Sequence, residues 1–386
     1  MPDTAVILLT LFVVYIAAQL GAEFLERLHL PGVVGEIAAG CVIGPSVLGW
    51  IEIHDALEVL AQFGAVLLLF SVGLETRLTD LKKVGVVALT VGVAGVIVPF
   101  VLAVWWAKGS GFDTPKAMFV PSAFIATSAG ITARVLQDLH VLNRIESRII
   151  LGAAVIDDVL AMLVLGVVTA LQTGERINIA GLGLVFLQAI GFIALMSLVG
   201  TRLMRRFSHL LEAPVNPLSP LTLCLALCLG VAAAASFVGL AAIIGAFLAG
   251  MAAAEADQRH TLQTQLQPIL ALLVPFFFVV TGANVELSEL GTMWALATLT
   301  IVTVLAIVSK IAGCGIGAWS IGKRSALIVG VGMVPRGEVG IIVASLGLHA
   351  GIFNQTIYAI IIAMSLLTSV IAPPALKLFL PGRKAG

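Results

Sequence analysis

Long apolar segments dominate this sequence and restrict what it can fold into. Of its 386 residues, 60% are hydrophobic and only 11% are charged. A helix needs about 20 mainly apolar residues to cross a bilayer, and short polar or Gly/Pro-rich breaks divide this chain into such segments. The sequence therefore predicts an all-α polytopic membrane protein. Its 21 basic and 21 acidic residues balance, which gives no indication of nucleic-acid binding.

Thirteen transmembrane helices are predicted, and the charges between them predict their orientation. The segments cover about residues 4–24, 32–50, 56–74, 84–107, 116–137, 146–172, 178–203, 218–236, 238–255, 266–283, 291–318, 325–347 and 356–379. Most of the 21 lysines and arginines lie on the side reached after odd-numbered segments, and only Lys108, Lys116 and Arg176 lie on the other. Basic residues collect on the cytoplasmic side. We therefore expect the N-terminus outside and the C-terminus in the cytoplasm.

An internal repeat is indicated by motifs that recur at a shift of about 210 residues. The Gly35–Cys41 motif is echoed by Gly245–Met251, and Gly73 is echoed by Gly282. The same shift relates the first six predicted helices to the last six, with one helix between. Because that extra helix takes the chain across the membrane, the second copy is expected to be inverted, as in many secondary transporters.

Two predicted helices, 116–137 and 325–347, have helix-breaking features at corresponding points of this repeat. Small and polar residues surround Thr127 in the first, and the repeat aligns Thr127 with Arg336 in the second. Pro335 removes a backbone donor beside Arg336. This pattern predicts two discontinuous helices that cross at mid-membrane. Kinks that serve only packing are the alternative.

Charged residues inside the apolar segments are the strongest functional signal. Asp157 and Asp158 are adjacent at the middle of one predicted helix, and Lys310 lies inside another. Membrane carboxylates usually mark ion or proton routes. Neighbours on a helix point about 100° apart, so one aspartate can pair with Lys310 while the other faces an ion path. A buried pair that serves only assembly is the alternative. Glu36 and Glu255, near segment ends, are expected to be solvated.

Four stretches resemble one transporter family. Ala126–Gln137, Ser147–Leu160, Phe70–Leu78 and Pro335–Gly340 together resemble the NapA-type bacterial Na⁺/H⁺ antiporters of the monovalent cation:proton antiporter superfamily. The resemblance covers essentially the whole chain and implies the NhaA-like antiporter fold, with inverted six-helix repeats and two discontinuous crossing helices. It also implies a bacterial cytoplasmic (inner) membrane location and a role in pH homeostasis.

By this resemblance, five residues would handle the ions. Asp158 would bind Na⁺ or H⁺ in alternation. Asp157 would pair with Lys310, a candidate proton carrier, and would join the ion site when that pair opens. Thr127 and Ser128 would complete the site with oxygens suited to a hard cation. No cofactor is expected beyond the transported ions.

The resemblance also implies a polar network and a division into domains. Arg336 and Glu338 would form the polar network at the second break. Residues 1–76 and 211–288 would form a dimerisation scaffold, residues 77–173 and 289–386 a mobile ion-transport core, and residues 174–210 a linker helix. The expected partners are a monovalent cation, protons, the bilayer and a second copy of the chain.

The function predicted is electrogenic export of cytoplasmic Na⁺ (or Li⁺) in exchange for H⁺ by alternating access. A K⁺/H⁺ antiporter on the same fold is the close alternative. An intramembrane aspartyl protease is a remote one, because that chemistry needs two carboxylates facing one water. A passive channel is disfavoured because no ring of symmetric ligands is evident. The chain is therefore not expected to be an enzyme.

Overall fold

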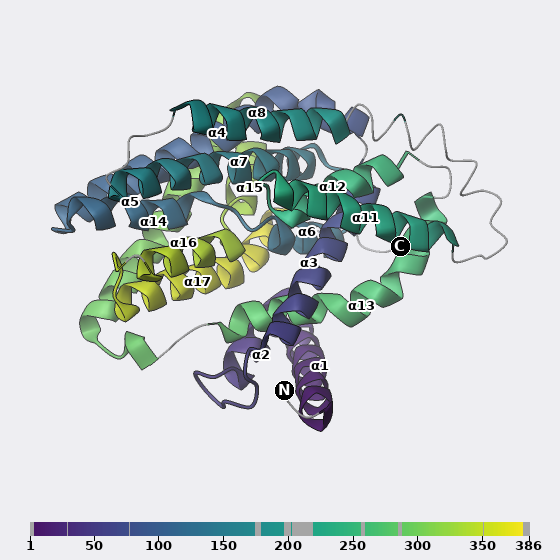
Figure 1. The fold of residues 1–386 in the computed structure, drawn as a ribbon, viewed down its shortest axis with the longest axis horizontal. Helices are drawn as coiled ribbons and strands as arrows, with labels where there is room; N and C mark the ends of the chain where they lie inside the picture. The colour runs from purple at the N-terminus through teal and green to yellow at the C-terminus, as the bar shows by residue number, and fades with distance from the viewer. Residues whose placement is uncertain are drawn as a thin grey trace.

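The computed structural model describes residues 4–28, 30–76, 78–173, 179–196, 202, 219–255, 259–284, 288–349 and 351–380. Across these ranges the regular structure is helical, with no strand, which confirms the predicted all-α class (Figure 1). Eight described stretches are long and apolar enough to cross a membrane, and one of them, Lys116–Asp138, is interrupted within the span. The predicted segment 178–203 lies partly outside the described residues.

One group of helices comes from the beginning and the middle of the chain. It contains α1 (Thr4–Arg27), α2 (Gly32–Ile43), α3 (Asp55–Glu75), α11 (Ser219–Phe237), α12 (Ala242–Ala253) and α13 (Arg259–Ala283). Within it α2 packs against α1 and α13, and α12 packs against α11 and α3. The helices of this group are labelled in the lower and right-hand parts of Figure 1.

A second group holds the charged residues. It contains α4 (Leu78–Gly109), α5 (Thr114–Ile125), α6 (Ala129–Asp138), α7 (Ile145–Thr173), α14 (Met293–Gly317), α15 (Lys323–Gly332), α16 (Glu338–His349) and α17 (Gln355–Phe379). Here α4 packs against α5, α7 and α14, while α17 packs against α14, α15 and α16. Helix α8 (Ile179–Leu195) contacts α7, and the short 3₁₀ helices η2 (Ser288–Leu290) and η3 (Trp319–Ile321) lie in connections.

Glycines let the helices of the first group approach closely at two equivalent crossings. A Cβ on Gly40 of α2 would overlap the carbonyl oxygen of Val279 on α13, and one on Gly250 of α12 would overlap that of Phe70 on α3. Small residues allow such backbone-to-backbone packing within membranes. The facing helices carry glycines at the same crossings, Gly282 and Gly73.

Two predicted segments, 32–50 and 238–255, are longer than the helices they contain. Helix α2 ends at Ile43 because Pro45 has no amide hydrogen and restricts the residue before it. Helix α12 begins only at Ala242, after Gly239 has turned the chain with φ 84°. Each helix has 12 residues and is therefore about 18 Å long, short of the roughly 30 Å hydrocarbon thickness.

The other two unusual segments are interrupted where the sequence predicts. Residues 126–128 separate α5 from α6, and residues 333–337 separate α15 from α16. The two breaks contact each other: the Ser128 amide donates a hydrogen bond to the Pro335 carbonyl at 2.8 Å. One turn away, the Thr132 hydroxyl donates to the Gly332 carbonyl, also at 2.8 Å. Backbone groups freed by each break are thus partly satisfied by the other.

Candidate functional site

A fully buried ion pair lies beside the first break, the non-helical residues 126–128 between α5 and α6. The Lys310 ammonium on α14 lies 2.9 Å from both carboxylate oxygens of Asp157 on α7, and both side chains are 0% exposed. It also donates to the carbonyls of Gly95, at 3.0 Å, and Ile125. A buried charge is costly unless it is paired and hydrogen-bonded. Here the carboxylate and two carbonyls use all three donors of the lysine.

The side chains of the first break point in different directions. The Thr127 hydroxyl donates to Asp157 Oδ2 at 2.7 Å, so the structure brings Thr127 to Asp157. The Ser128 hydroxyl is buried against Gly337, and within the described chain it has no hydrogen-bond partner. Successive residues of extended backbone face opposite sides, and Ala126 and Ser128 are extended. The two hydroxyls expected to act together are therefore separated.

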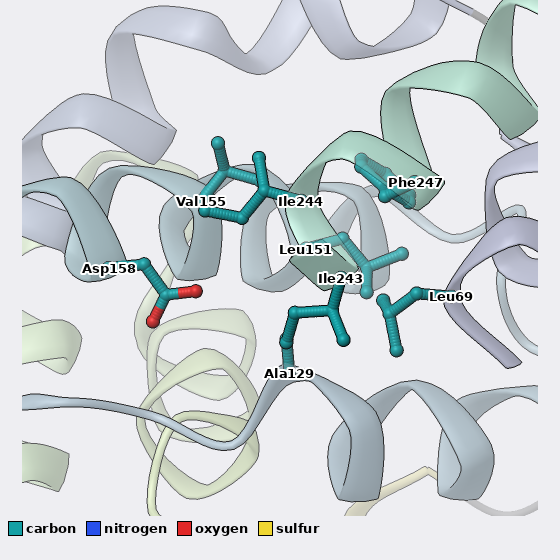
Figure 2. Close-up of a pocket in the computed structure, with 8 residues that line it drawn as sticks. All are labelled: Leu69, Ala129, Leu151, Val155, Asp158, Ile243, Ile244 and Phe247. Atoms are coloured by element: carbon teal, nitrogen blue, oxygen red, sulfur yellow. The ribbon is translucent and has the colours of Figure 1, made fainter. Parts of the chain in front are cut away.

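Asp158 faces away from the ion pair and lines a small pocket. It is 4% exposed and shares a face of α7 with Leu151 and Val155. The pocket measures about 10 Å³, room for about one water molecule. Figure 2 shows the carboxylate at one end and the apolar side chains around the rest. The other lining residues come from α3, α6 and α12: Leu69, Ala129, Ile243, Ile244 and Phe247.

Arg336 is the second buried cation of the site. It is 0% exposed, and its guanidinium donates to the carbonyls of Ala126 at 3.1 Å and Ala306 at 3.4 Å. Ala126 caps the C-terminus of α5, the end at which the helix dipole favours a positive charge. Lys310 donates to the preceding carbonyl, Ile125. Both cations therefore lie at the end of α5.

Glu338 is only partly described. It is the first residue of α16, and its side chain lies outside the described residues. The predicted network at this break can therefore be traced only from Arg336.

A polar face of α17 also belongs to this region, although the sequence analysis did not select it. The Ser369 hydroxyl donates to the Arg336 carbonyl, and the Arg336 amide donates to the Thr368 hydroxyl at 3.3 Å. Ser365 is buried one turn earlier. Hydroxyl residues spaced i, i+3 and i+4 in an otherwise apolar helix are the signal that would have indicated this face.

The expectation that Glu36 is solvated was wrong. Its side chain is 7% exposed, because α1, α6, α13 and α17 all contact α2. Glu255, which follows α12, is partly exposed.

The chemistry available at the site follows from its oxygens and charges. In the described part of the chain, no group of three or more His, Cys, Asp or Glu side chains is arranged to hold a metal ion. The region offers carboxylate, hydroxyl and carbonyl oxygens, which are the kinds of ligand that hard cations prefer. A single carboxylate can bind a proton or a hard cation, and binding of either one lowers its affinity for the other.

Two interrupted helices that meet inside the protein, beside buried acids and bases, are typical of membrane transporters for small ions. A sodium/hydrogen exchanger family model (sodium/hydrogen exchanger, transmembrane) matches residues 7–381. The chain belongs to this family, and its class is therefore transporter and not enzyme.

Curated relatives and solved structures match over nearly the full length. The chain is 35% identical over 372 residues to the Na⁺/H⁺-K⁺ antiporter GerN of Bacillus cereus, covering 94% of each. It is 34% identical to the high-affinity Na⁺/H⁺ antiporter NhaS3 of Synechocystis, covering 98% of this chain and 90% of that one. The solved structure of the sodium proton antiporter MjNhaP1 from Methanocaldococcus jannaschii matches with a TM-score of 0.67 at 20% identity, covering 96% and 97%. That structure supports the fold.

Proposed function

We propose that this protein is an antiporter that exports cytoplasmic Na⁺, or Li⁺, in exchange for H⁺ by alternating access. The observation that carries the proposal is the Asp158 carboxylate, which is buried next to the paired Asp157 and Lys310 where two broken helices meet. Membership of the sodium/hydrogen exchanger family supports it. The protein would lie in the bacterial cytoplasmic membrane and serve pH homeostasis.

Alternating access is supported by the position of the Asp158 pocket. Its walls come from α6 and α7 of the second helix group and from α3 and α12 of the first. A larger pocket of about 490 Å³ lies among α3, α12 and α13, and Ile243 lines both pockets. In the proposed orientation the larger pocket opens outside. A relative movement of the two groups would then open Asp158 to one side at a time.

Exchange is proposed to be electrogenic, with two protons for each Na⁺. In the proton-loaded state Asp158 is neutral and the charges of Asp157 and Lys310 cancel. In the Na⁺-loaded state both carboxylates face the cation, and Lys310 loses its carboxylate partner and releases its proton. These groups then carry one net negative charge with Na⁺ included. Arg336 stays charged in both states, so it does not change the difference.

The architecture proposed is thirteen spanning helices in two inverted six-helix repeats, with the N-terminus outside and the C-terminus inside. The equivalent glycine crossings of α2 with α13 and of α12 with α3 support the repeat. The first helix group would be the scaffold and the second the mobile core, with the domain limits predicted above. Only 11% of the most apolar 18 residues of helix α1 are buried inside the protein. Its free face supports a homodimer formed by the scaffold.

A K⁺/H⁺ antiporter is the second candidate, because one relative is named a Na⁺/H⁺-K⁺ antiporter. Proton flux in proteoliposomes driven by Na⁺, Li⁺ or K⁺ decides between the two. We expect flux with Na⁺ and Li⁺, and none from an Asp158→Asn variant. Flux with K⁺ alone would favour the second candidate, and full turnover by the variant would remove Asp158 from the mechanism.

A further inference from the structure

Glu36 is a buried acid for which the exchange mechanism has no use. It lies on α2, one turn after the helix begins at Gly32, and is 7% exposed. One of its carboxylate oxygens, Oε2, is buried without a hydrogen-bond partner in the described chain. An ionised carboxylate in such a place is costly, whereas a protonated one is tolerated. The buried position of Glu36 in this structure therefore favours its neutral, protonated form.

The charges around Glu36 come from two helices that would move relative to each other. The Glu36 carboxyl interacts electrostatically with Arg134 and Asp138 on α6 and with Glu26 on α1. Arg134 and Asp138 form a salt bridge at 3.2 Å, and His140 interacts electrostatically with Asp138. At the same ends of the other helices packed against α2, the charged residues are Arg259 and His260 on α13 and Lys377 on α17. Glu75 lies at the same end of α3, which packs against α6.

Helix α6 connects this cluster to the ion site. It begins directly after Ser128, the last residue of the first break, and it contacts α2, α3 and α17. At its other end Gln137 donates to Ser71 at 3.1 Å and to Glu75 at 2.8 Å on α3. In the proposed orientation these contacts close the cytoplasmic side. Opening that side requires α6 to leave α2 and α3.

We propose that Glu36 is a proton-binding site that controls this closure from the cytoplasm. Protonated Glu36 stays buried and keeps α6 against α2, which slows exchange. When cytoplasmic alkalinisation ionises it, the carboxylate needs water, and α6 moves away so that water can reach it. The inference rests on the proposed antiport function and orientation. The consequence is that cytoplasmic acid inhibits exchange through Glu36, separately from proton competition at Asp158.

Transport in everted membrane vesicles, whose cytoplasmic face is exposed to the bath, tests this inhibition through Glu36. Saturating Na⁺ is used so that protons do not compete with Na⁺ at Asp158. The native rate should fall as the bath is acidified. Glu36→Gln should be slow at every pH, about tenfold below native in alkaline medium, and Glu36→Ala should stay fast in acid. Glu36→Asp should keep the native pH dependence, as should the control Glu23→Gln, an exposed residue on α1. Native rates and pH dependence in Glu36→Gln would overturn the inference.

A second measurement does not depend on turnover. Ala133 on α6 is 0% exposed, and a cysteine introduced there by Ala133→Cys, with the four native cysteines replaced, reports the closure. A membrane-impermeant maleimide should label it from the cytoplasmic side only in alkaline medium, and Glu36→Gln should prevent labelling. Labelling that does not depend on pH, or that Glu36→Gln leaves unchanged, would contradict control of the closure by Glu36. Absence of Na⁺-driven flux in the native protein would instead contradict the proposed function.

Discussion

Replacing Lys310 by glutamine should destabilise the protein through Asp157, whose buried carboxylate would lose its charged partner. Asp157 is 0% exposed, and the Thr127 hydroxyl would remain as a donor to it. Breaking a buried ion pair by removing one partner costs about 3–5 kcal/mol. The expected loss of stability is therefore about 3–5 kcal/mol.

The loss should be reversible by a second change. The double variant Asp157→Asn, Lys310→Gln buries no charge at these positions and should recover most of the stability at neutral pH. Heat-induced unfolding of the purified protein in detergent, followed for native, single and double variants, gives the coupling energy.

A matched control is Lys108→Gln, at an exposed position near the end of α4, which should change stability by less than about 0.5 kcal/mol. The reasoning is refuted if Lys310→Gln is as stable as native at neutral pH, or if the double variant is less stable than the single one.

Three further predictions concern packing, the break and the ion site. Gly250→Val should prevent α12 from packing on α3, because a Cβ would overlap the Phe70 carbonyl; folded yield in detergent should fall, while Gly109→Ala, in open space, should not change it. Thr127→Val should remove a hydrogen bond to a charged group and lower stability by about 1.5–3 kcal/mol, whereas unchanged unfolding would contradict that bond. On the acid limb, a tenfold rise in proton concentration should raise the apparent KM for Na⁺ at least about tenfold; a constant KM would contradict a shared site.

The sequence predicted the parts of the structure that follow from local chemistry and membrane depth. Pro335 and the small residues around Thr127 cannot sustain a regular helix, and both breaks lie where these residues are. Aspartates and a lysine inside apolar segments need partners, and Asp157 and Lys310 lie together.

What the sequence did not predict depends on how helices pack. Glu36 lies near a predicted membrane surface, yet neighbouring helices cover it, and no local pattern encodes that cover. Thr127 and Ser128 are adjacent in sequence, and only the extended backbone of the break sends their side chains apart.

The response of exchange to voltage tests the central claim most directly. In proteoliposomes under an imposed potassium-diffusion potential, Na⁺/H⁺ exchange by the native protein should respond to voltage, because its two moving states differ by one charge, worth about 2.3 kcal/mol per 100 mV. Exchange by the double variant Asp157→Asn, Lys310→Gln should not respond, because only Asp158 would still titrate. Native exchange that ignores the imposed potential would contradict the mechanism and leave Lys310 as a structural partner of Asp157.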